Sequence, residues 1–205
     1  MFFRPRSRKI TERAPLPPRL TGLLRESRWL LLAAIAFYLI LVLSTYDKAD
    51  PGWSHSVVVD QVHNAGGRFG AWLADLLLYL FGVSAYWTVL FLGFVTWWGY
   101  RHIEFAGETH DRRPFWIACT GFLILLLSSS CIEALRLHSL KVDLPLAPGG
   151  VLGMALGKPL FSAFGFTGAT LTLLITGGVG LSLFTGMSWL TACEKLGEWI
   201  ERACD

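Results

Sequence analysis

The stretch LLLYLFGVSAYWTVLFLGFVTWWGY, residues 76–100, carries no charged side chain over twenty-five consecutive positions. As one helix it would be about 37 Å long, which exceeds the hydrocarbon core of a bilayer, about 30 Å, and allows a tilted crossing. Three aromatic residues crowd its far end and are followed by Arg101 and His102, as in an aromatic belt with a basic flank. The pattern predicts a transmembrane helix over residues 71–100.

Three further apolar runs have the length of a crossing. They cover residues 29–45, 115–133 and 167–190. The first is seventeen residues long, about 26 Å as a helix, with Arg28 and Tyr46 placed to act as interfacial anchors. The composition agrees, because 53% of the residues are hydrophobic and 16% are charged, against about 25% charged in soluble domains. We therefore expect an all-α integral membrane protein with a four-helix transmembrane domain over residues 29–190.

The last apolar run is too long for a single crossing. Residues 159–193 are thirty-five uncharged positions, about 52 Å as one helix. A break near Gly165 and Gly168 would leave a short interfacial piece before the fourth span. Residues 144–157 are also apolar but number fourteen and include two prolines. They favour an interfacial or re-entrant helix in the second outer loop over a fifth span.

The distribution of positive charge predicts the orientation. Residues 1–28, 101–114 and 191–205 together hold thirteen of the eighteen Lys and Arg. Basic residues mark the cytoplasmic side, so both termini are expected there. Residues 1–28 also contain four prolines, which favours a flexible basic cytoplasmic tail. A nucleic-acid-binding arm is the alternative, but aromatic residues suited to base stacking are almost absent there.

The C-terminal segment, residues 191–205, has the pattern of an amphipathic helix leaving the membrane. It would lie on the surface or pair with a partner helix. Counted from Trp189, charged residues fall on one face of the pattern, and the other face carries Trp189, Cys193, Leu196, Ile200 and Cys204.

Two acidic residues stand at the outer ends of spans. Asp75 lies near the start of the second span and Glu133 at the end of the third. An acid buried in a span is a functional candidate, either as a proton relay or, as a pair, for cation binding. The competing interpretation is solvation at headgroup depth. It is favoured because no basic partner or second acid lies within the other spans.

No pattern in the sequence predicts a catalytic, cofactor-binding or metal site. The four cysteines include no C-x-x-C pair, and Cys119 and Cys131, about 18 Å apart along one helix, are too distant for a disulfide. His55, Asp60 and His63 form a loose cluster without the spacing of metal ligands.

One segment superficially resembles a phosphate loop. It ends in the pair Gly157 and Lys158, but Leu152 stands where the first glycine is needed and Pro159 where Ser or Thr is needed. We therefore expect neither enzymatic activity nor a nucleotide from these residues.

Small side chains recur along the fourth span. Gly168, Thr172, Thr176 and Gly180 are spaced every four residues. Such ridges allow close backbone approach, which drives helix association in lipid. The contact could form within the chain or between chains, and the pattern leaves both open.

Several blocks of the sequence, in order, resemble the N-terminal membrane domain of the DNA translocase FtsK. The resemblance covers roughly residues 29–200, and the basic tail does not share it. The blocks are ADPGWS at 49–54, HNAGG at 63–67, GAWLAD at 70–75, FGVSAY at 81–86, PGGVLG at 148–153, LFTGMSWLT at 183–191 and EKLG at 194–197.

The resemblance implies a cell-division role at the inner membrane. FtsK proteins anchor a hexameric, ATP-driven DNA pump at the division septum and couple chromosome segregation to constriction. Their four-span domain contacts other divisome membrane proteins, so a homo-oligomeric septal anchor is expected here. The ATPase motor and DNA-reading domain have no counterpart before Asp205, so DNA would be contacted through a region beyond these residues. The chain is then either a fragment or a stand-alone homologue.

The first outer loop is the expected partner contact. It is polar and contains Asp50, Trp53, His63 and Asn64, which a periplasmic or membrane protein could recognise. A small transporter or channel is the alternative function, although charged groups that would line a path are absent from the span interiors. An intramembrane enzyme would need a Ser–His pair or paired acids at membrane depth.

Overall fold

The structure, a computed structural model, describes residues 18–57, 59, 61–101, 113–137, 144–189, 193–194, 197–198 and 201. These residues are helical or loop, with no strand among them, which confirms the all-α prediction. The elements in chain order are α1 (Pro18–Ser44), α2 (Gly67–Phe81), the 3₁₀ helix η1 (Gly82–Tyr86), α3 (Trp87–Arg101), α4 (Arg113–Arg136) and α5 (Gly150–Thr185).

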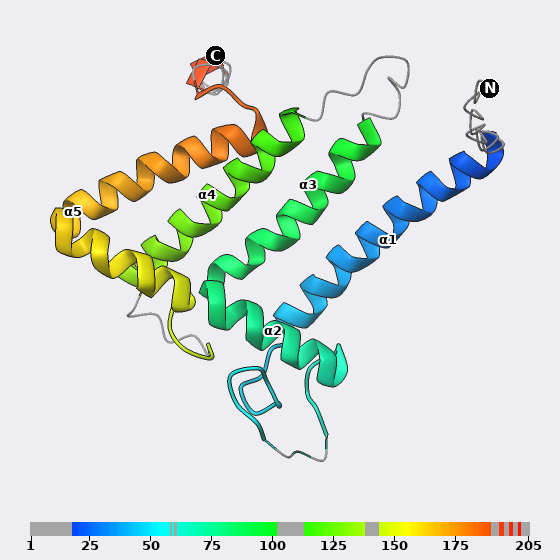
Figure 1. Cartoon of the computed structure of the whole chain (residues 1–205), viewed down its shortest axis with the longest axis horizontal. Helices are drawn as coiled ribbons and strands as arrows, with labels where there is room; N and C mark the ends of the chain where they lie inside the picture. Colours follow the sequence, from blue (N-terminus) through cyan, green and yellow to red (C-terminus); the bar gives the residue numbers. More distant parts are fainter. Residues whose placement is uncertain are drawn as a thin grey trace, which may run out of the picture.

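Four helical stretches in the described part of the chain are long and apolar enough to cross a membrane. They are Glu26–Ser44, Gly67–Trp97, Phe115–Arg136 and Gly150–Thr185. Figure 1 shows α1, α3, α4 and the second half of α5 running alongside one another. In the same view α2 and the first half of α5 lie across one end of this bundle. The start of α1 and the end of α5 both lie at the opposite end of the bundle, on different sides of it, as an even number of crossings requires.

Helix α1 begins earlier than expected. The predicted first span starts at residue 29 and the tail covers residues 1–28, but the helix begins at Pro18. Proline is compatible with a first helical turn, because its fixed φ is helical and its missing N–H would be unpaired there anyway. Residues 1–17 lie outside the described residues.

The second crossing is not the single helix predicted over residues 71–100. The chain turns a corner at Gly82, which has φ 63° and ψ −142° and ends α2. A Cβ at Gly82 would come within 2.2 Å of the amide nitrogen of Gly149. The corner therefore packs against a segment sixty-seven residues later, so closely that a side chain at residue 82 would not fit. It divides the apolar run into α2, η1 and α3.

Helix α5 bends where a break was predicted. Gly165 has φ 66° and ψ −179° inside an otherwise continuous helix. The helix expected in the second outer loop is its first half, which begins at Gly150. The second half ends at Thr185, five residues before the predicted boundary, because Gly186 adopts a left-handed conformation and donates its N–H to the Ser182 carbonyl over 2.8 Å.

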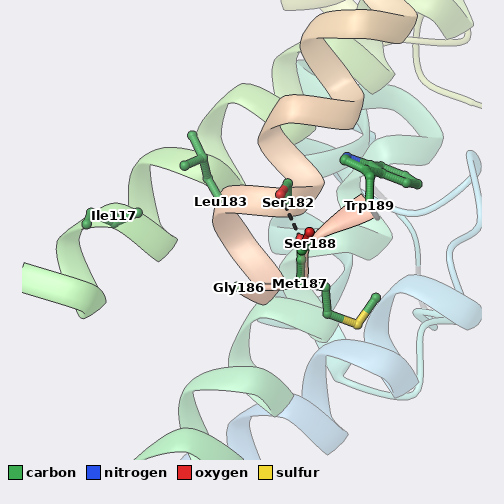
Figure 2. Close-up of a pocket in the computed structure, with 7 residues that line it drawn as sticks. All are labelled: Ile117, Ser182, Leu183, Gly186, Met187, Ser188 and Trp189. Atoms are coloured by element: carbon green, nitrogen blue, oxygen red, sulfur yellow. Dashed lines mark hydrogen bonds between the residues drawn. The ribbon is translucent and has the colours of Figure 1, made fainter. Parts of the chain in front are cut away.

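An open pocket of about 560 Å³ lies where α5 ends. Figure 2 shows that Trp189 folds back alongside α5, and its indole N–H donates to the carbonyl of Gly178 over 3.2 Å. The Ser182 hydroxyl donates to the carbonyl of Met187 over 2.7 Å and tightens the same turn. Most of the predicted exit helix, residues 191–205, lies outside the described residues. The described positions 193–194, 197–198 and 201 are helical.

Candidate functional site: three buried carboxylates at one end of the bundle

The Asp75 carboxylate is buried and fully engaged. Its side chain is 1% exposed. It accepts hydrogen bonds from the backbone N–H of Ser54 at 2.6 Å, the Ser54 hydroxyl at 3.1 Å and the Tyr46 hydroxyl at 3.3 Å. Gly52 passes so close that a Cβ there would lie 2.5 Å from the Asp75 carboxyl carbon. The expectation that Asp75 is solvated at headgroup depth is therefore wrong, because the outer loop folds over it.

Asp50 connects the beginning of the first outer loop to its end. Its carboxylate accepts the backbone N–H of His63 at 2.8 Å and that of Asn64 at 2.7 Å, and lies 3.2 Å from Nδ1 of His63. Burial opposes ionisation of Asp50, but these hydrogen bonds and the nearby His63 ring outweigh it and lower the pKa of the carboxyl. Asp50 is therefore an ionised, buried tie between the two ends of the loop.

Asn64 joins this loop to the end of α1. Its side-chain amide donates to the carbonyls of Val42 at 2.9 Å and Thr45 at 3.2 Å, which the helix leaves unpaired at its C-terminus. Its side-chain oxygen accepts the N–H of Gly66 at 2.9 Å, just before α2 begins. Asn64 thus caps one helix and leads into the next.

The Glu133 carboxylate joins three segments of the chain. Its side chain is 7% exposed. One oxygen accepts the backbone N–H groups of Ser84 at 3.1 Å and Gly149 at 3.2 Å, and the other accepts the Ser84 hydroxyl at 2.5 Å. The Ser129 hydroxyl lies 3.4 Å away and also accepts the indole N–H of Trp87 at 3.2 Å. Glu133 is therefore not solvated at the interface, as expected, but holds η1 and the start of α5 against α4.

Glycines allow the start of α5 to pack closely against α2 and α4. A Cβ at either Gly149 or Gly153 would lie 2.2 Å from the Ser130 carbonyl oxygen, and one at Gly150 would lie 2.5 Å from the Leu80 carbonyl. Gly149 and Gly150 also have positive φ, which favours glycine at both positions. The PGGVLG block at 148–153 is thus the contact point of α5 with α2 and α4.

The arrangement ties segments together and offers no evident reaction centre. Among the residues that the structure describes, no three His, Cys, Asp or Glu side chains are grouped as metal ligands would be. All three carboxylates, of Asp50, Asp75 and Glu133, accept hydrogen bonds from N–H or O–H donors of the same chain. Their chemical role is to fix the outer loop and the helix corners.

The four predicted partner-contact residues divide into two pairs. Asp50 and Asn64 are buried and hold the loop together, so they do not present a surface to a partner. Trp53 is 52% exposed, and the His63 side chain is also exposed. Of the four residues, Trp53 and His63 are therefore the ones whose side chains a partner protein could contact.

The predicted small-residue ridge does not form the contact between α4 and α5. Gly180 is buried against Leu125 and Gly121, but Thr172 and Thr176 are exposed. Positions spaced by four drift about 40° around a helix at each step, so the ridge leaves the packed face. The prediction that Thr172 and Thr176 pack against another helix of the same chain is therefore wrong. Packing of these threonines against a second chain stays a prediction. The face that packs contains Ala169, Leu173, Gly177, Gly180 and Phe184.

Sequence reasoning missed the partners of Glu133. Ser84 and Gly149 both lie in blocks that carry the family resemblance, FGVSAY and PGGVLG. The two blocks were the only indication in the sequence that these residues matter. In the structure, Ser84 of the first block and Gly149 of the second both donate hydrogen bonds to the Glu133 carboxylate.

Comparison with known proteins assigns the chain to a family. The model of a family described as the 4TM region of DNA translocase FtsK/SpoIIIE matches residues 21–197. The chain belongs to this family. The FtsK/SpoIIIE 4TM region accounts for the four apolar crossings of the described residues, and it includes all three buried carboxylates and the outer loop.

Individual relatives agree with this assignment. The chain is 46% identical over 198 residues to DNA translocase FtsK 2 of Ralstonia nicotianae, covering 93% of this chain and 25% of that protein. It is 34% identical to DNA translocase FtsK of Shewanella oneidensis, covering 87% and 19%, and 35% identical to that of Pseudomonas aeruginosa, covering 85% and 22%. The chain thus spans a quarter or less of the length of these relatives. No solved structure matches it at a significant level.

Proposed function

We propose that these residues are the inner-membrane anchor of an FtsK/SpoIIIE-type DNA translocase. The observation that carries the proposal is the family match over residues 21–197 together with four apolar crossings. The relatives named as DNA translocases are at least four times longer than the matched region. ATP-driven DNA movement would belong to those further residues of the whole protein, which the anchor would hold at the cytoplasmic face.

We further propose that the first outer loop recruits the anchor to the division septum by contacting divisome membrane proteins. Trp53 supports this role because it is exposed on a backbone that is fixed on both sides. Ser54 is bonded to Asp75, and the N–H of Gly52 donates to the carbonyl of His55 over 3.0 Å. A rigid, exposed Trp supplies a large contact area with little loss of conformational entropy on binding.

A localisation experiment tests both proposals. A fluorescent fusion of residues 1–205 should form bands at midcell. Trp53→Ala should weaken the bands without lowering the amount of fusion in the membrane fraction, because it removes a contact and no span length. Trp116→Ala is the matched control, since Trp116 is 65% exposed on α4 and lies outside the loop.

The outcomes separate the two proposals. A fusion that is membrane-bound but evenly distributed at normal protein level refutes septal recruitment and leaves the anchor intact. A fusion absent from the membrane fraction refutes the anchor. Equal midcell bands in Trp53→Ala and Trp116→Ala would show that recruitment does not depend on Trp53.

A further inference from the structure

An apolar groove of about 480 Å³ runs between α1 and α3, far from the buried carboxylates. Its lining includes small residues of both helices and two Trp residues, one near the start of α1 and one near the end of α3. Among the lining residues only Thr96 carries a hydroxyl, and it donates to the Leu92 carbonyl over 2.7 Å. The surface of the groove is therefore apolar. The lining residues are Trp29, Ala33, Ala36, Phe37 and Ile40 of α1 with Gly93, Thr96 and Trp97 of α3.

The shape of the groove suits a hydrocarbon chain. Trp29 and Ile40 are eleven residues apart, about 16 Å along α1, and the groove is open along its side. An extended acyl chain can therefore lie along the helices, with its methylene groups against Ala33, Ala36 and Gly93.

The Trp29 end of the groove carries a positive charge. The guanidinium carbon of Arg28 lies 4.7 Å from the centroid of the Trp29 ring, and the Arg28 side chain is exposed. The indole nitrogen of Trp29 is covered, and no acceptor within the described residues bonds to it. The ring is thus held by packing and by Arg28, with its N–H unpaired in the described part of the chain, at the end where a lipid headgroup would lie. Trp and Arg side chains are common at that depth of a membrane.

We propose that the α1–α3 groove binds one acyl chain of an anionic phospholipid, with the headgroup phosphate against Arg28. A rotation of the Trp29 ring would let its N–H reach an ester or phosphate oxygen of the same lipid. The predicted orientation places this end at the cytoplasmic leaflet, where anionic lipids attract basic residues next to a span. The site is a lipid site on the flank of the anchor and is independent of septal recruitment.

Native mass spectrometry of detergent-purified 1–205 tests the proposal. The protein is incubated with phosphatidylglycerol or phosphatidylcholine carrying the same acyl chains. We expect one retained lipid per chain and preference for phosphatidylglycerol. Gly93→Phe should abolish retention by filling the groove, and Gly93→Ala, the matched control, should keep it. Gly93→Ala is not expected to disturb the fold, because a Cβ at Gly93 meets no atom within 4 Å. Thermal unfolding of Gly93→Phe at the same temperature as Gly93→Ala is the check that its ring is accommodated.

A headgroup variant gives a second, independent readout. Arg28→Gln should reduce the preference for phosphatidylglycerol about fivefold, the effect of one basic residue near an anionic surface, while chain binding persists. Equal retention by Gly93→Phe and Gly93→Ala would overturn the groove as the site. An unchanged headgroup preference in Arg28→Gln would overturn the role of Arg28. Dimers that disappear in Gly93→Phe would show that a second copy occupies the groove instead.

Discussion

Replacing Glu133 should open the junction between η1, α4 and α5. In Glu133→Ala the backbone N–H groups of Ser84 and Gly149 lose their acceptor while still buried. A buried donor left unpaired costs about 1–3 kcal/mol, so two of them lower the free energy of unfolding by about 4 kcal/mol. The two serine hydroxyls add little, because Ser84 already lies 2.6 Å from the Ser129 hydroxyl and can pair with it.

Glu133→Gln separates hydrogen bonding from charge. Its carbonyl oxygen can take the place of the carboxylate oxygen that accepts both backbone N–H groups. Its amide nitrogen then faces the Ser84 hydroxyl, which can accept a hydrogen bond. The network survives without a negative charge, so the free energy of unfolding should fall by about 1 kcal/mol or less.

Equilibrium unfolding in mixed micelles of a mild detergent and dodecyl sulfate measures both effects. Leu123→Ala on the exposed face of α4 is the control and should change the free energy of unfolding by about 0.5 kcal/mol or less. Glu133→Ala as stable as the unmutated chain would refute the junction. If Glu133→Gln is as unstable as Glu133→Ala, the negative charge itself is required. That result would contradict the claim that Glu133 stabilises the junction as a hydrogen-bond acceptor.

Three further predictions concern glycine geometry, pH and self-association. Gly82→Ala combines a positive φ with a clash against backbone and should cost about 3 kcal/mol, whereas Gly93→Ala, in open space, should cost nothing when their thermal unfolding is compared. Because the pKa of Asp50 is lowered in the folded chain, its ionised carboxylate stabilises the fold above pH 3.8, and this stability is lost as pH falls through the lower folded pKa. Hydrogen exchange of the loop amides that Asp50 accepts, corrected for the intrinsic rate, should therefore become faster as pH falls below the folded pKa. Thr172→Leu and Thr176→Leu should leave thermal stability unchanged because both side chains are exposed, and loss of in-membrane crosslinking between copies would locate a subunit contact there, while unchanged crosslinking would rule it out.

The four crossings could be predicted because lipid requires long, charge-free helical segments, and residue types alone reveal these. The corner at Gly82 could not be predicted, since a charge-free run looks uniform along the sequence. Gly82 combines a positive φ with close contact to Gly149, which lies in a different part of the chain. The kink at Gly165 was easier to place, because the run containing it exceeds the thickness of a bilayer.

The environments of the acidic residues were misjudged for a related reason. Asp50, Asp75 and Glu133 are each paired with backbone N–H groups, and residue types do not show where such donors will point. A search of the other spans for a basic partner of Asp75 or Glu133 finds none and suggests exposure, whereas the donors lie in loops and on the backbone. Likewise Asn64, which looks like a surface residue, caps α1 because its side chain reaches the unpaired carbonyls there.

Topology mapping tests the central claim, a four-crossing anchor with both ends in the cytoplasm, most directly. Reporter enzymes fused after residues 55, 107, 141 and 205 should report the periplasm, the cytoplasm, the periplasm and the cytoplasm, in that order. This pattern would place the end of the chain on the side where DNA lies. A periplasmic signal at residue 205, or the same side reported at 55 and 107, would contradict the account.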